Sequence, residues 1–84
     1  MSVAATVRLD YPGSLLDRPL IHDLIRQFDL LTNILEAQVS ARGGYLIVQV
    51  HGSREQVERG LSWLSSQGAQ VRTLSEIEAE APGA

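Results

Sequence analysis

Stretches of two different hydrophobic periods alternate along this chain, and their order is the feature that most constrains its fold. Apolar and polar side chains alternate at every second residue, as in half-buried strands, over residues 3–11, 33–42 and 45–51. A further short strand is expected over residues 69–74. Apolar stripes at helical spacing predict one helix over 18–28 and a second that follows Ser53. The expected order is therefore strand, helix, strand, strand, helix, strand.

Punctuating residues mark where these elements begin and end. Asp17 is expected to cap the first helix, and Ser53-Arg54-Glu55-Gln56 has the form of a capping box at the start of the second. Gly68 fits the position just past that helix, where a left-handed conformation ends it. Gly43-Gly44 is expected to supply the positive φ of a two-residue hairpin turn.

This order has few compact arrangements, because strand–helix–strand connections are right-handed. We expect an α+β, ferredoxin-like βαββαβ fold, with a four-stranded antiparallel sheet of order 4-1-3-2 and two helices on one face. The folded domain is expected over residues 1–75, and the acidic residues 76–84 are expected to form a disordered tail. The core positions expected to link both helices to the sheet are Leu24, Leu35, Val48 and Leu61. Gly60 is expected to let the second helix approach the sheet.

The other face of the sheet is expected to be open. Its predicted residues are mostly polar, and the alternation places four apolar ones among them: Ile34, Tyr45, Ile47 and Leu74. Trp63 lies off the inward stripe of the second helix. Packing of Trp63 against the sheet edge or the tail is favoured over contact with a partner, although Trp is common at binding hot spots.

Composition excludes several classes of protein. The 84 residues make one domain, and the absence of cysteine removes disulfides, thiolate metal sites and iron–sulfur ligation by this chain. The net charge is −3 and the seven basic residues are scattered arginines, so nucleic acid is not an expected partner. Neither a membrane span nor a signal peptide is recognisable, so we expect no membrane insertion and a cytoplasmic location.

No constellation of catalytic residues is visible. His22 falls on a helix and His51 at a strand end, and helix capping accounts for Ser53, which lies near His51. Two histidines without cysteine show no metal-ligand spacing. We therefore expect no enzyme activity, no catalytic residues, no metal site and no cofactor.

Asn33 follows a threonine where the first helix is expected to give way to a strand. It has two interpretations: a turn former, because asparagine tolerates left-handed conformations, or a donor and acceptor for a small zwitterion. From the residues alone the turn former is favoured.

The chain resembles the NIL domain family over roughly residues 5–74. The resemblance rests on the joint order of Asn33-Ile34-Leu35, Val39, Gly43-Gly44, a strand that ends in His51-Gly52, the helical segment Gly60-Leu61-Ser62-Trp63-Leu64, and Gly68-Ala69-Gln70-Val71. Ala37 and Gly60 depart from it, where the family often carries Gly and Ala respectively. NIL domains are similar to ACT-type regulatory domains and occur at the end of ATP-binding subunits of methionine importers, where they bind methionine and inhibit transport.

The resemblance implies a non-enzymatic regulatory domain that binds a small ligand, methionine or a related amino acid, through Asn33, Ile34 and Leu35. The alternative is a protein–protein interaction or assembly module without a small ligand. A protein partner is expected in either case. The exposed sheet edges also predict a homodimer.

Overall fold

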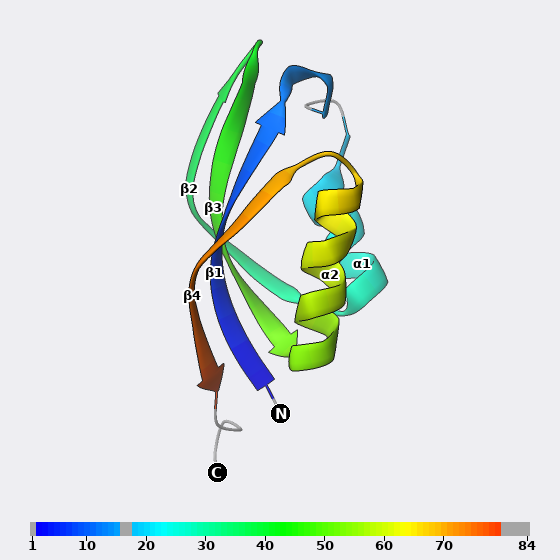
Figure 1. The fold of residues 1–84 in the computed structure, drawn as a ribbon, viewed down its shortest axis with the longest axis vertical. Helices are drawn as coiled ribbons and strands as arrows, with labels where there is room; N and C mark the ends of the chain where they lie inside the picture. Colours follow the sequence, from blue (N-terminus) through cyan, green and yellow to red (C-terminus); the bar gives the residue numbers. More distant parts are fainter. Residues whose placement is uncertain (1, 16–17, 80–84) are drawn as a thin grey trace.

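The computed structural model describes residues 2–15 and 18–79. Its elements are β1 (Ser2–Pro12), the short 3₁₀ helix η1 (Gly13–Leu15), α1 (Leu20–Phe28), β2 (Leu31–Ser40), β3 (Gly43–Ser53), α2 (Arg54–Ser66) and β4 (Gln70–Ala79). The strands lie in the order β2-β3-β1-β4 and all neighbours are antiparallel. Both helices lie on one side of the sheet (Figure 1). The predicted ferredoxin-like fold and strand order are therefore confirmed.

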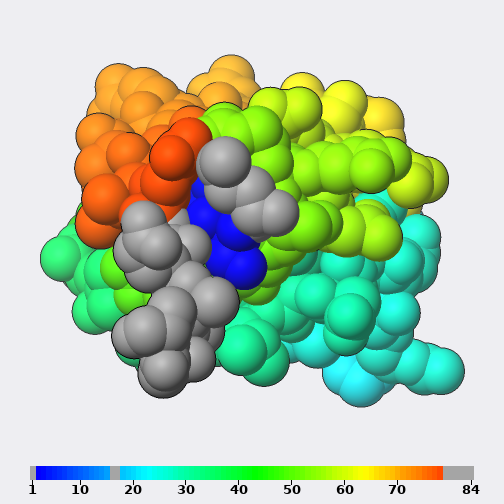
Figure 2. Space-filling view, turned by 90° about the horizontal axis from the view of Figure 1, so that it is seen from below, coloured from blue at the N-terminus to red at the C-terminus, as the bar shows by residue number. Residues whose placement is uncertain are grey.

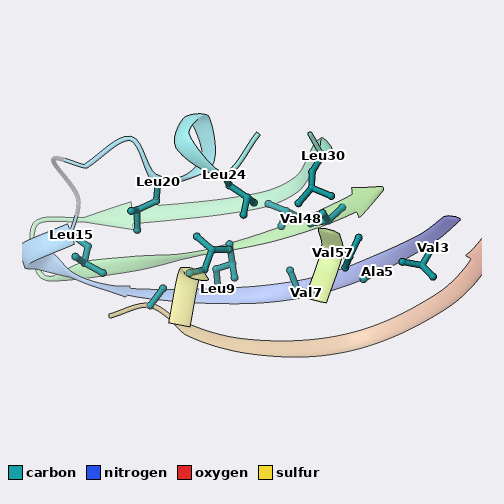
Figure 3. Packing of buried hydrophobic residues seen from close by; sticks show 13 residues of the cluster. Val3, Ala5, Val7, Leu9, Leu15, Leu20, Leu24, Leu30, Val48 and Val57 are labelled. Carbon is teal, nitrogen blue, oxygen red and sulfur yellow. The ribbon is translucent and has the colours of Figure 1, made fainter. Parts of the chain in front are cut away.

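The core lies between the sheet and the two helices. Every second side chain of β1 is fully buried there, as the alternation predicts: Val3, Ala5, Val7 and Leu9. Figure 3 shows Leu20 and Leu24 of α1 pointing toward the strands. The remaining buried residues of this cluster come from the connections, from β3 and from α2: Leu15, Leu30, Val48, Val50, Val57, Leu64 and Ala69. Leu24 and Val48 hold their predicted core positions, whereas Leu61 is only half-buried.

A bulge at Leu35 corrects the predicted faces of β2. Ile34 pairs with Val48 and Glu36 pairs with Ile47, so Leu35 has no partner on β3. Because Val48 is a core residue, Ile34 lies on the helix side of the sheet. The prediction that Ile34 lies on the open face is therefore wrong. Ile34 and Leu35 are each 54% exposed, so Leu35 is not a core residue. A bulge adds one residue to a strand and shifts the alternation beyond it, which simple periodicity does not register.

The ends of the first helix and of the hairpin differ from prediction. Helix α1 begins at Leu20, after Pro19, whose side chain makes no capping bond. The predicted cap, Asp17, lies outside the described residues. The hairpin turn is formed by residues 41–42, and Gly43, with a φ of 139°, opens β3 instead. A side chain at Gly43 would collide with the backbone oxygen of Tyr11 on the neighbouring strand, so this glycine also permits close packing.

The predicted ends of α2 are confirmed. The Ser53 Oγ accepts a hydrogen bond of 3.2 Å from the Gln56 N–H, and Gly68 follows the helix with a φ of 106°. Gly60 allows a close approach, but to α1 and its following loop instead of the sheet. A Cβ there would lie 2.9 Å from the side chains of Leu24 and Leu30.

Trp63 packs on the neighbouring helix α1. Its ring lies against Phe28, with centroids 5.9 Å apart and planes tilted by 53°. Both side chains rest on the outside of the core cluster. The favoured packing interpretation of Trp63 therefore holds with a different neighbour.

Strand β4 runs further than predicted. It continues to Ala79, and Ser2, Val3, Ala4 and Ala5 of β1 pair with its last residues. The predicted tail over 76–84 is thus wrong for 76–79, and residues 80–84 lie outside the described residues. Seen from this end of the molecule, the end of β4 and the start of α2 lie beside the start of β1 (Figure 2).

Candidate functional site

The Asn33-Ile34-Leu35 tripeptide lies on β2, which is one edge of the sheet. Asn33 pairs with Gln49, one residue from the pair of Ile34 with Val48, so its side chain lies on the open face. Asn33 and Ile34 therefore point to opposite sides of the sheet, and Leu35 sits at the bulge. The three side chains do not converge on one point.

Asn33 does not form a turn. It is the third residue of β2, and the left-handed residue between α1 and β2 is Asp29, with a φ of 52°. Aspartate is among the residues that tolerate this conformation best. The favoured turn interpretation of Asn33 is therefore wrong, because the connection ends two residues earlier than expected. Its role in ligand binding stays a prediction.

A row of neutral polar side chains crosses the open face at the level of Asn33. Successive cross-strand partners place four residues in this row, one on each strand: Asn33, Gln49, Thr6 and Ser75. Asn33 and Ser75 are exposed at the two edges, and the other two are half-buried. Amides and hydroxyls both donate and accept hydrogen bonds, so the row has no fixed charge preference. We call these four residues the polar row.

Small and apolar residues border the polar row on one side. The next cross-strand set on the open face runs Leu31, His51, Ala4, Ile77. Its outer members are strongly exposed, Leu31 by 74% and Ile77 by 62%. The His51 Nε2 lies 3.0 Å from the Gln49 Oε1, which fixes the orientation of that amide. Sequence reasoning placed Gln49 on the open face, but only the strand register joins it to Asn33.

A charged network occupies the other end of the open face. The Arg8 Nε and Nη2 each lie 3.1 Å from a carboxylate oxygen of Asp10, and the guanidinium carbon lies 4.1 Å above the centre of the Tyr45 ring. The Tyr45 hydroxyl in turn donates to Glu36. The hydrogen bond to Asp10 raises the pKa of Arg8, and the one to Glu36 raises the pKa of Tyr45. The network joins β1, β3 and β2.

Over residues 2–15 and 18–79, no group of three or more His, Asp or Glu side chains is arranged to hold a metal ion. Within the same ranges, no helix has the length and apolar character that crossing a bilayer requires.

The model of the NIL domain matches residues 5–73. Methionine import ATP-binding protein MetN of Escherichia coli K12 and MetN 1 of Salmonella typhimurium LT2 are each 27% identical over 75 residues. The match covers 84% of this chain but only 22% of those proteins, so the chain spans about a fifth of their length.

Solved structures give the same fold. The C-terminal domain of an ABC transporter ATP-binding protein from Enterococcus faecalis aligns with a TM-score of 0.77 at 16% identity, over 84% of this chain and 83% of that one. The de novo designed protein Foldit4 aligns with a TM-score of 0.60 at 12% identity, over 95% of this chain and all of the designed one. At these identities the likeness shows the fold alone. With the family model matching most of its length, this chain belongs to the NIL domain family.

Proposed function

We propose that this domain is a non-enzymatic regulatory module that binds methionine or a related amino acid on the open face at Asn33. The observation that carries the proposal is the position of Asn33, which is exposed on that face and has Gln49 as its cross-strand partner. A zwitterion needs both donors and acceptors, and these two amides supply both. The similarity to methionine import proteins supports the choice of ligand.

The apolar part of the ligand has neighbours on the same strand. Leu31 lies on the open face two residues before Asn33, and Leu35 is exposed at the bulge two residues after it. A thioether is soft and apolar and packs well against such side chains. Ile34 lies on the helix side, so its part in the site is to hold β2 against Val48.

A second copy of the chain is proposed to cover this site. Strand β2 is a sheet edge with four exposed apolar side chains, Leu31, Ile34, Leu35 and Val39. The other edge, β4, carries the charges of Arg72, Glu76 and Glu78, which discourage pairing. An exposed amide on a flat face binds a small molecule weakly unless something excludes water from it. A two-fold pairing at the β2 edge would place the partner's edge strand beside Asn33 and reduce the exposure of its side chain to water.

We also propose that the domain contacts a protein partner and acts in the cytoplasm. The relatives are named as ATP-binding proteins of methionine import, and this chain matches about a fifth of their length. It contains no G-x-x-x-x-G-K-[ST] sequence, so ATP hydrolysis would belong to another part of such an assembly. We infer a regulatory contact with a protein partner in the cytoplasm.

Titration calorimetry of the wild-type protein and of Asn33→Ala tests the proposal. Methionine and norleucine, which replaces the thioether sulfur with a methylene, are expected to bind better than glutamine. Asn33→Ala is expected to weaken methionine binding by about 1–3 kcal/mol, because it removes hydrogen bonds to a charged group. Gln38→Ala is the matched control, since Gln38 is also exposed on the open face of β2. Absence of heat with millimolar methionine, with the fold verified, would contradict the proposal.

The interaction module is the second candidate, and the exposed apolar edge of β2 favours it. In that case the edge docks another protein and Asn33 is a solvated strand residue. Titration calorimetry distinguishes the two candidate functions, because only the first predicts a saturable heat of binding with methionine.

A further inference from the structure

We propose that Arg72 and Arg8 form a second binding site on the open face, for the carboxylate group of a small molecule. The two arginines are direct cross-strand partners on β4 and β1. They line a surface hollow together with Asp10, Gln70 and Val71. The proposal does not depend on the function proposed for Asn33.

The charges in this hollow do not balance. Like charges on directly opposed residues of a sheet destabilise it. Asp10 neutralises Arg8 through two 3.1 Å contacts from its guanidinium nitrogens. Among the ion pairs and side-chain hydrogen bonds of residues 2–15 and 18–79, none involves Arg72. The charged residues that line the hollow, Arg8, Arg72 and Asp10, therefore leave one positive charge, which suits one carboxylate; Glu36 acts on Arg8 from outside this lining.

Arg8 is held in place before any ligand arrives. The Nε and Nη2 groups of Arg8 donate hydrogen bonds to the Asp10 carboxylate, and the guanidinium carbon of Arg8 lies 4.1 Å from the centre of the Tyr45 ring. Tyr45 is itself fixed by Glu36 across the sheet. A side chain that is already ordered loses less entropy on binding. The contacts with Asp10 use Nε and Nη2 and leave Nη1 of Arg8 for a ligand, and Arg72 is the cross-strand partner of Arg8 on the next strand.

Carboxylate is the chemistry that fits. A guanidinium presents parallel N–H donors that match the two oxygens of a carboxylate. Gln70, the cross-strand partner of Asp10, adds an amide at the end of the hollow. Asn33 and Arg72 lie on opposite edge strands, three strand spacings or about 14 Å apart. A single amino acid bound at Asn33 does not reach Arg72.

An NMR titration tests this site directly. Acetate is added to the ¹⁵N-labelled protein at constant ionic strength, and the Arg side-chain and backbone amide signals are followed. We expect saturable shifts at Arg8, Gln70 and Arg72. Acetamide, which has the same shape without charge, is expected to cause none. Arg72→Gln should weaken acetate binding by about tenfold or more, because it removes a charged donor pair.

Two controls and one further probe complete the experiment. Arg26→Gln alters an exposed arginine on α1 and should bind acetate as wild type does. In Asn33→Ala the acetate-induced shifts at Arg8, Gln70 and Arg72 should persist, which separates this site from the one proposed above. Equal shifts in Arg72→Gln, or shifts that grow without saturation at every arginine, would overturn the proposal. Phosphate that binds as tightly as acetate would overturn its selectivity for carboxylate.

Discussion

The Arg54 Nη1 lies 3.1 Å from the Glu76 Oε2 and so joins the first residue of α2 to the last part of β4. The same guanidinium reaches Glu78 through Nη2 at 3.4 Å. Glu76 and Glu78 pair with Ala5 and Val3, which are core residues, so both acids lie on the helix side of the sheet. The hydrogen bond to Glu76 raises the pKa of Arg54. One arginine thus holds the acidic end of β4 over the edge of the core.

The first prediction is that Arg54→Gln loosens this end of β4 without unfolding the domain. Amide hydrogens around Ile77 and Glu78 should exchange faster, because local opening needs less free energy. Global stability should change little, since the three side chains are partly exposed and water screens their attraction. Arg59→Gln is the control, because it breaks only the 3.9 Å pair with Glu55 within α2. Unchanged exchange in Arg54→Gln would show that pairing with β1 alone holds the segment.

The sequence predicts disorder at the end of β4 because this contact joins residues that lie far apart in the chain. Residues 75–84 are mostly acidic or small and include Pro and Gly, which is the composition of a solvated tail. The order of residues 76–79 depends on β1 at the other end of the chain and on Arg54, which lies 22 residues before Glu76. Neither neighbour is visible in a local window. The bulge at Leu35 was missed for the same reason, because its position depends on the register with β3.

Other parts of the fold followed from local pattern. The inward face of β1 and the stripe of α1 each repeat without interruption, so a single period placed Val7 and Leu24 in the core. Fewer residues of the candidate site could be predicted from the sequence. Asn33 was recognised through the family motif, but Gln49 and Thr6 join it only through pairing of β2 with β3 and of β3 with β1. Residues that meet across strands leave no signal in the spacing of one sequence.

The second prediction compares two leucines that the sequence alone placed in the core. Leu24 is fully buried and packs beside Gly60, whereas Leu35 is 54% exposed. Leu24→Ala should lower the free energy of unfolding by about 2–4 kcal/mol, through lost burial and a new cavity. Leu35→Ala should lower it by less than about 1 kcal/mol, as is usual for exposed sites. Urea denaturation measures both, and equal losses would contradict the bulge.

The third prediction concerns the stability of the domain in alkali. Burial raises the pKa of Tyr11 to about 12, and its hydroxyl has no hydrogen-bond partner among the described residues. The unfolded chain therefore releases this proton at lower pH than the native one, so the protonated phenol stabilises the fold. That contribution is fully present below the ordinary pKa of about 10 and is lost as the pH rises toward 12.

Tyr11→Phe tests this account. The variant should unfold less readily than wild type between about pH 10 and 12, because phenylalanine has no proton to lose. At neutral pH it should be at least as stable, since a buried hydroxyl without a partner is removed. Tyr45→Phe is the comparison at neutral pH, where it should lose stability because it removes the hydrogen bond that the Tyr45 hydroxyl donates to Glu36. Parallel alkaline unfolding curves for wild type and Tyr11→Phe would refute the assignment.

The fourth prediction is that the domain is a homodimer through the β2 edge. A charge placed on an edge strand opposes pairing, because the partner strand would have to bury it. Ile34→Lys on β2 should therefore yield monomers in analytical ultracentrifugation at high micromolar concentration. Ile34 is 54% exposed, so the folded monomer should accommodate the lysine.

Leu74→Lys on β4 separates this edge from the other one. Leu74 is 48% exposed and is the unpaired residue of the bulge on β4, and Ile34 is the neighbour of the bulge residue on β2, so each side chain is about half exposed on an edge strand of the monomer. If β2 forms the interface, Leu74→Lys stays dimeric and only Ile34→Lys dissociates. The reverse result would move the interface to β4 and leave Asn33 uncovered. A wild-type protein that sediments as a monomer would remove the cover proposed for Asn33, and any methionine binding would then occur on an open face.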